Sequence, residues 1–370
     1  MITPKRTINE SVILQRERRL PISGISHVKA GEIVPYDKCV LATEIKGEIQ
    51  VIRLSEKLGI DPESISDGLL IKEGYSLKKG DLIFERKSFF SFLDLKENSP
   101  VEGMVEFISL NSGHIGIRLK SKKLELQAFI PGEIKEVQKE RTVILSSHVG
   151  LIQGIVGYGG EGVGRIHFFD NSEDEILDIN CIKCLEVGNG PTILVGGKSF
   201  SEDFFNWANN HNIIGIVTSS IDAGDVKNIL KTSALGVNPA YASNLPTVVI
   251  IEGFGSIPLS KRSVEFFRHS HGKLASINGL TQVRAGAIRP ELIVHEPLLT
   301  KAPVSETLAA FPEIGDSMRI VRGRYFGKVG RILEIPKMIE TLESGVETHV
   351  AILELDQARV SVSLANLESL

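Results

Sequence analysis

The residues best suited to chemistry in this chain are a run of basic side chains near the C-terminus. Five of them and no acidic residue fall between Ser317 and Leu333, and together they are called the basic strip: Arg319, Arg322, Arg324, Lys328 and Arg331. Guanidinium and ammonium groups at such spacing can contact phosphates or carboxylates. Tyr325 and Phe326 stand among them and could stack on a nucleic-acid base.

Charge restricts what the basic strip can bind. The whole chain has a formal net charge of -4, so any affinity for an acidic polymer must come from one local surface. Residues 313–370 contain seven basic and nine acidic residues, so even this region is not basic overall. Three interpretations stay open: contact with nucleic acid, contact with a protein partner, and packing against the same polypeptide.

A Gly-Lys-Ser triplet offers a second candidate site. Lys198 and Ser199 follow an apolar run and precede a helical pattern, where a helix N-terminus could bind a phosphate group. A phosphate-binding P-loop also needs a glycine at the position that Thr192 occupies. We therefore expect at most a weak ligand contact here.

Two arginines form a third candidate. Arg284 and Arg289 lie in a polar loop after a predicted strand, and open α/β sheets bind ligands beyond the carboxyl ends of their strands. They could hold a carboxylate or phosphate, or they could pair with Glu291 or with another domain.

Three further motifs favour structural roles. Residues 157–162 fit the pattern G-x-G-x-x-G, but strand-like text follows, which indicates a glycine-rich hairpin. Cys181 and Cys184 form a single C-x-x-C without a second cysteine pair, and a buried strand is the better interpretation. His269 and His271 end a predicted helix, where a basic group favours the helix dipole. No metal and no cofactor are expected.

The elements before residue 190 are predicted to be strands. Residues 1–25 form either a mobile basic arm or an edge strand or helix that docks on the body. Short apolar runs separated by turn residues predict a β domain over 26–150 and a β-rich connecting segment over 151–189.

Part of the β domain resembles a known fold. The segments 76–86 and 99–109 are similar to the two halves of a barrel-sandwich hybrid, the fold of biotinyl and lipoyl carrier domains. They also resemble a module in the C subunit of the Rnf electron-transport complex. Carrier domains present a lysine at the hairpin between the halves. Residues 87–98 offer no lysine in that setting, so no swinging-arm cofactor is expected.

Residues 190–297 are predicted to form a small parallel α/β domain. Fully apolar strands alternate there with amphipathic helices. Ser201 and Ser260 are expected to cap the first and third helices, and a second helix is expected to begin near Asp222. A proline-containing linker over 298–312 follows.

The last unit, residues 313–370, is predicted to be a small closed or nearly closed β-barrel, because short alternating strands and glycine turns follow one another. Its first part resembles the KOW motif of NusG-type elongation factors and ribosomal proteins, at these positions: Gly315, Asp316, Arg319, Gly323, Tyr325, Gly327 and Gly330. The resemblance implies an SH3-like barrel that contacts a ribonucleoprotein or a transcription complex. Arg324 stands where the motif often has proline, and residues 336–348 make a longer excursion than usual.

Taken together, the patterns predict a multidomain, β-rich α+β protein with a barrel-sandwich-like β domain, a parallel α/β domain and a KOW-like barrel. Three cysteines, no secretory-type apolar leader and no apolar run of the roughly 20 residues that span a bilayer favour the cytoplasm and no membrane insertion. The expected function is that of a non-catalytic binding or adaptor protein. The alternatives are a self-assembling, homo-oligomeric scaffold subunit, and an enzyme or small-ligand sensor with its site in the α/β domain.

Overall fold

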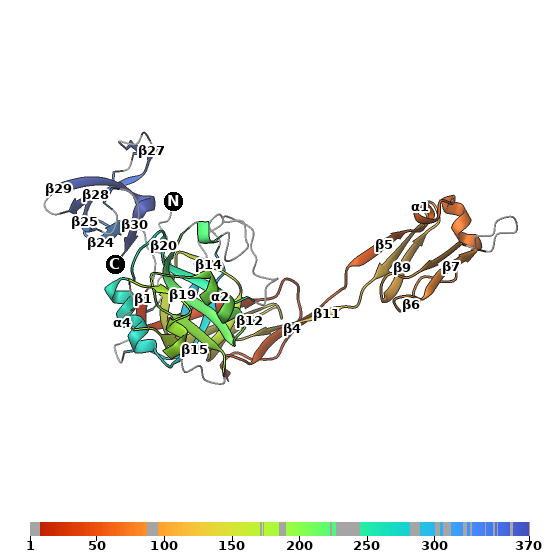
Figure 1. The fold of residues 1–370 in the computed structure, drawn as a ribbon, viewed down its shortest axis with the longest axis horizontal. Coiled ribbons are helices and arrows are strands. Elements are labelled where there is room, and N and C mark those ends of the chain that lie inside the picture. The colour runs from red at the N-terminus through yellow and green to blue at the C-terminus, as the bar shows by residue number, and fades with distance from the viewer. Residues whose placement is uncertain are drawn as a thin grey trace.

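The computed structural model divides the chain into three parts with separate hydrophobic cores (Figure 1). We call them the central body, the distal unit (residues 46–121) and the C-terminal module (residues 312–369). The structure describes these residues: 8–86, 95–170, 172, 174–184, 190–222, 224–226, 245–281, 289–299, 304–305, 312–320, 324–325, 328–336, 338–342, 345, 347–355 and 358–369.

A 12-stranded sheet runs through the central body in the order β14-β20-β19-β17-β15-β21-β22-β13-β1-β23, and β12 branches from β13 and pairs with β3 on its other side. One half of it is antiparallel, except that β23 runs parallel to β1, and contains these strands: β1 (Ile8–Arg19), β3 (Ile33–Val34), β12 (Gly132–Gln138), β13 (Thr142–Gln153), β22 (Glu291–Val294) and β23 (Val304–Ser305). Residues 8–19 are thus a paired strand and not a mobile arm. The reason is that Val12 and Leu14 are buried in the core while β1 pairs with β13 along its length.

The other half of this sheet has a parallel centre, as the apolar runs predicted. β15 (Glu161–Phe168), β17 (Thr192–Val195), β19 (Ile213–Ile221) and β20 (Thr247–Phe254) pair in parallel. β14 (Val156–Tyr158) and β21 (Leu274–Asn278) pair antiparallel with β20 and β15. Next to this sheet lie β16 (Ile176–Leu177) and β18 (Ser199–Phe200), which pair with each other.

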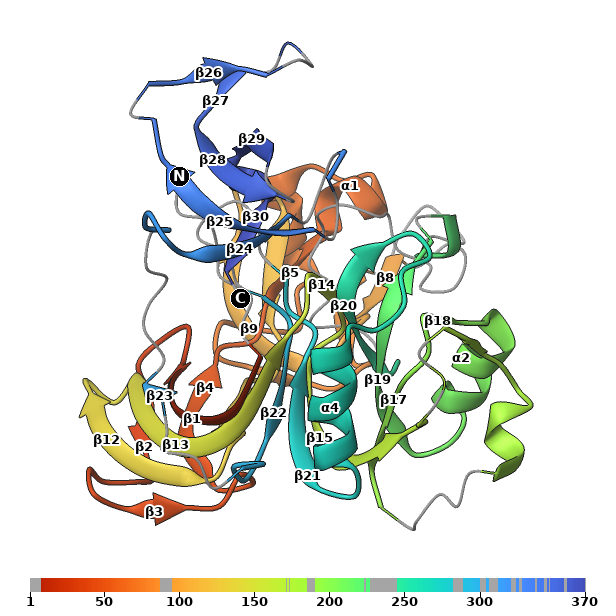
Figure 2. The same cartoon turned by 90° about the vertical axis from the view of Figure 1, so that its left-hand side faces the viewer.

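Two helices cover opposite faces of the parallel strands (Figure 2). Phe204 and Phe205 of α2 (Glu202–Asn209) pack on one face, and Phe266 and Phe267 of α4 (Lys261–Ser270) pack on the other. Both predicted caps are present, because Ser201 accepts a hydrogen bond from the N–H of Phe204, and Ser260 from that of Ser263. The helix expected after Asp222 lies almost wholly outside the described residues.

Two local predictions in this half are wrong. Residues 157–162 do not form a hairpin, because β14 pairs with β20 whereas β15 pairs with β17 and β21. Cys181–Cys184 is a 3-10 helix, η2, and not a strand. The side chain of Asp178 accepts hydrogen bonds from the N–H groups of Asn180 and Cys181, and such an Asx turn competes with extended backbone.

The distal unit is inserted between two strands of a stem, β4 (Cys39–Ile45) and β11 (Lys122–Gln127), which pair antiparallel; β2 (Ile25–Ser26) pairs with β4. Its sheet has the order β5-β10-β9-β6, with β5 (Ile49–Arg53), β10 (His114–Arg118), β9 (Gly103–Ser109) and β6 (Ser76–Leu77). It also contains α1 (Leu54–Leu58), η1 (Pro62–Asp67) and the pair β7 (Leu82–Arg86) and β8 (Leu95–Asn98). Residues 26–150 therefore contribute to two cores.

The C-terminal module is a five-stranded antiparallel sheet in the order β29-β28-β25-β24-β30. Its strands are β24 (Ser317–Ile320), β25 (Val329–Glu334), β28 (Val350–Leu355), β29 (Ala358–Ser363) and β30 (Leu367–Ser369), with η3 (Leu364–Asn366) before the last. The pairings of its described residues leave β29 and β30 as two ends, so a closed barrel is not observed. The excursion after residue 336 forms a ribbon of β26 (Glu340–Thr341) and β27 (Glu347–Thr348).

Candidate functional site

The basic strip is divided between two strands and the turn that joins them. Arg319 lies on β24 and Arg331 on β25, while Arg324 and Lys328 lie between these strands. Met318 and Ile320 are buried on either side of Arg319, so the predicted alternation of β24 is confirmed. Arg322 and Phe326 lie outside the described residues.

Arg319 contacts the central body. Its Nη1 donates to Oε2 of Glu252 over 3.2 Å, and Glu252 lies near the end of β20. The Glu252 side chain is 2% exposed and that of Arg319 is 20% exposed. The other carboxylate oxygen, Oε1, accepts hydrogen bonds of 3.3 Å from the N–H of Ser260 and from the hydroxyl of Ser263.

This arrangement is a docking contact with a clear electrostatic reason. Removing a carboxylate from water costs several kcal/mol unless a counter-charge and hydrogen-bond donors replace the water. Arg319 supplies a positive charge, and Ser260 supplies its N–H at the start of α4, where the helix dipole favours an anion. For Arg319, the structure shows packing against the same polypeptide, one of the three open interpretations.

The other described members of the basic strip, Arg324, Lys328 and Arg331, lie on the surface of the module. Arg331 donates from Nε to the carbonyl oxygen of Gly315 over 3.2 Å. Exposed and buried residues alternate along β25, and Arg331 is one of the exposed ones. The Arg324 guanidinium lies 5.7 Å from the centre of the Tyr325 ring. Tyr325 also packs against the core of the module, which leaves less of its ring for stacking on a base.

The Gly-Lys-Ser triplet has no cradle of free amides. The N–H groups of Gly196, Gly197 and Lys198 donate to Val217 O, Ser172 Oγ and Glu175 O. Ser199 begins β18, and Lys198 Nζ lies 3.4 Å from Asp174 Oδ1. Because these amides already have acceptors, they cannot bind a phosphate group as a P-loop does.

The two arginines of the third candidate are not brought to a site in the described residues. Arg289 donates from Nη1 to the carbonyl of Gly154 at 3.5 Å, and Arg284 lies outside those residues. Glu291, the partner considered for them, forms an ion pair with Arg16 of β1. It therefore joins β1 to β22 across the central sheet.

The two histidines at the end of α4 have structural partners. His269 Nδ1 lies 2.8 Å from Glu10 Oε1, and His271 Nδ1 accepts a hydrogen bond of 3.2 Å from the N–H of Phe168. Among the described residues there is no group of three or more metal-ligating side chains that could hold a metal ion. In the same residues, no helix is long and apolar enough to cross a membrane.

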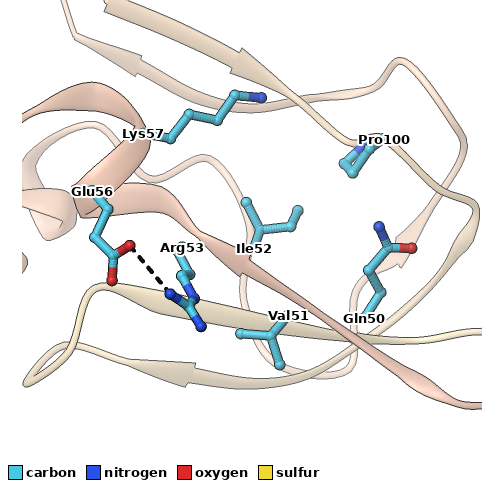
Figure 3. A pocket seen from close by; sticks show the side chains of 7 residues that line it. All are labelled: Gln50, Val51, Ile52, Arg53, Glu56, Lys57 and Pro100. Atoms are coloured by element: carbon cyan, nitrogen blue, oxygen red, sulfur yellow. Dashed lines mark ion pairs between the residues drawn. The ribbon is translucent and has the colours of Figure 1, made fainter.

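The distal unit has a hollow that was not expected from the sequence. It lies beside β5 and has a volume of about 410 Å³. Figure 3 shows the side chains that line it. Its walls are formed by these side chains: Gln50, Val51, Ile52, Arg53, Glu56, Lys57 and Pro100. The sequence did contain a signal for an apolar surface here. Ile49, Val51 and Ile52 place apolar side chains on both faces of one short strand, whereas a strand with one buried face needs them on that face alone.

Comparison with known proteins adds no relative. The chain matches no protein-family model and no curated protein sequence. The candidate sites therefore rest on geometry: a docked arginine at the module, and an open hollow at the distal unit.

Proposed function

We propose that this chain is a non-catalytic binding protein that acts as an adaptor between partners. The observation that carries the proposal is the arrangement of its parts: the central body holds two separately cored units apart (Figure 1). A unit that is inserted through two strands keeps most of its surface available for a partner. The proposal predicts that different partners are lost when the two units are altered one at a time.

The C-terminal module is proposed as a KOW-like docking module. Arg324, Lys328 and Arg331 form its remaining basic surface, because Arg319 is held by Glu252. A protein with a small acidic patch suits this module better than nucleic acid does, since the excess of acidic over basic residues opposes an extended polyanion more than a local patch, and Tyr325 packs against the core.

The combined variant Arg324→Glu and Lys328→Glu tests this surface without disturbing Arg319. We expect it to lose a protein partner in a pull-down from native lysate, and we expect nuclease treatment to leave wild-type capture unchanged. Arg359→Glu, an exposed charge reversal on β29 of the same module, is the matched control and should retain the partner. Nuclease-sensitive capture, or RNA binding whose salt dependence falls in the double variant, would favour nucleic acid instead.

The distal unit can be removed at a defined point. Ile45 and Lys122 are opposite each other at the end of the stem, so an Asn-Gly turn between them should close β4 and β11 into a hairpin. We expect the shortened chain to unfold cooperatively, with a melting temperature lowered by no more than about 4 °C, equivalent to roughly 1 kcal/mol. Thermal unfolding followed by circular dichroism measures this.

The same shortened chain tests the adaptor proposal. It should lose the partners of the distal unit and keep those of the C-terminal module in the pull-down. A shortened chain that folds and keeps every partner would contradict a binding role for the distal unit.

A further inference from the structure

Strand β5 of the distal unit has an open edge. Among the described residues it pairs with β10 on one side and with no strand on the other. The hollow described above lies beside it. Exposed edges with unpaired backbone groups readily accept another strand, and proteins usually block them with lysine, proline or a bulge. Residues 49–52 contain neither lysine nor proline, and their pairing with β10 is regular.

The register shows which backbone groups point to this edge. The N–H of Leu119 donates to the carbonyl of Glu48 over 2.9 Å, so residues 48 and 119 are a hydrogen-bonded pair. Because such pairs alternate in an antiparallel ladder, Gln50 and Ile52 also direct their backbone groups toward β10. The N–H and C=O groups of Ile49 and Val51 therefore face the open edge, and Arg53 follows them as the N-cap of α1.

Apolar side chains accompany these backbone groups. Ile49 is 40% exposed and Val51 is 47% exposed. Gly116 of β10 lies between Val51 of β5 and Phe107 of β9, because it pairs with both. A Cβ atom on Gly116 would lie 2.2 Å from the Phe107 ring. The ring thus covers the glycine and continues the apolar surface from β5 onto the sheet.

The charges around the hollow favour an anionic group. Its lining contains two cations, Arg53 and Lys57, and one carboxylate, Glu56. Arg53 pairs with Glu56 at 3.6 Å, and both side chains are more than 60% exposed, so a ligand carboxylate can compete for this arginine. Lys57 lies across the hollow and is 59% exposed although it pairs with Glu97 (Figure 3).

We propose that the open edge of β5 binds an extended segment of a partner protein as an added strand. Alternate side chains of that segment are apolar and rest on Ile49 and Val51, and an acidic side chain lies near Arg53 and Lys57. This proposal rests on the adaptor function and names the surface and the kind of partner that the distal unit takes. Backbone hydrogen bonds supply affinity in this mode of recognition, and the alternate side chains supply specificity.

A second copy of the chain suits the edge less well. In antiparallel self-pairing about Val51, outward-facing residues must pair with outward-facing residues. Arg53 would then lie opposite Ile49 of the second copy. That register gives the cation an apolar neighbour, whereas a partner segment can present a carboxylate there.

Peptide selection on the full-length chain tests the proposal. The probe is a displayed library of random twelve-residue peptides, and binding of the enriched peptides is then measured by fluorescence anisotropy. We expect peptides with alternating apolar residues and an Asp or Glu. Val51→Pro should weaken the binding of these peptides by about tenfold, because proline removes an edge-facing N–H group that does not pair with β10.

Three variants accompany this measurement. Val51→Thr keeps the backbone and the shape of the side chain and should bind almost as well as the wild type. Arg53→Glu should weaken the acidic peptides by about fivefold. Ile49→Lys, a charged edge residue, replaces Val51→Pro if the proline variant does not fold, and it should also weaken binding.

The outcomes separate this inference from the adaptor proposal. Enriched peptides that bind Val51→Pro as tightly as the wild type would overturn the strand-addition site, and so would a selection without edge-dependent peptides. A wild-type dimer in sedimentation equilibrium that Val51→Pro dissociates would show that a second copy occupies the edge. In each of these cases, loss of partners from the chain without the distal unit would still support the adaptor function.

Discussion

Replacing Arg319 by methionine is expected to weaken the attachment of the C-terminal module to the central body by about 3 kcal/mol. The variant leaves the Glu252 carboxylate, which is 2% exposed, without the positive charge that Arg319 places on it. Either the buried anion stays poorly compensated or the module moves away so that water reaches it. Urea unfolding gives the energy, and proteolysis within residues 298–312 reports detachment.

Arg331→Met is the matched control, because it removes an arginine from the neighbouring strand whose guanidinium bonds to Gly315. It should cost less than about 1 kcal/mol, as exposed charges do. A double-mutant cycle with Glu252→Met should give a coupling energy of about 1 to 3 kcal/mol between Arg319 and Glu252. Equal effects of Arg319→Met and Arg331→Met, with no coupling, would show that the contact does not hold the module.

Acidification from pH 6.5 to pH 4 is expected to remove about 3 kcal/mol of stability through His295 alone. Burial lowers the pKa of His295 to about 4. Its Nε2 lies 2.7 Å from Ser276 Oγ, and its ring packs 5.2 Å from that of Tyr36. Because Ser276 donates its proton to the carbonyl of Phe129, Nε2 of the neutral histidine must be the donor to Ser276.

The direction follows from the two states. An unfolded histidine has a pKa of about 6.5, so between that value and about 4 the unfolded chain binds a proton that the folded chain excludes. The contribution is complete above pH 6.5 and is lost as the pH falls toward the folded pKa.

Urea unfolding at pH 7, 5.5 and 4 measures this effect in the wild type and in His295→Gln, which keeps an N–H donor at the site. Stability should fall less steeply with pH in the variant. His167 provides the background in both chains, since burial and the nearby His271 also lower its pKa. Identical slopes for the two proteins would mean that His295 is not held neutral by burial.

Local structure followed from short stretches of sequence. The parallel apolar strands, the caps Ser201 and Ser260 and the alternation around Arg319 were predictable, because each depends on residues a few positions apart. Cys181–Cys184 was misassigned although its cause is local, since Asp178 turns the chain three residues earlier. Which strands pair with one another was not predictable in this way. The glycines at 157–162 indicated a turn, but they did not indicate which strands would pair on either side of it.

The sites show the same division. Composition and spacing were enough to predict a β-rich, multidomain chain and a basic strip with three open interpretations. Only the tertiary structure placed Glu252 beside Arg319, 67 residues apart, and only the insertion of residues 46–121 into the stem left β5 with an open edge. Both depend on contacts between distant segments. The free energy of such contacts comes from desolvation and strand pairing, which no short window of sequence contains.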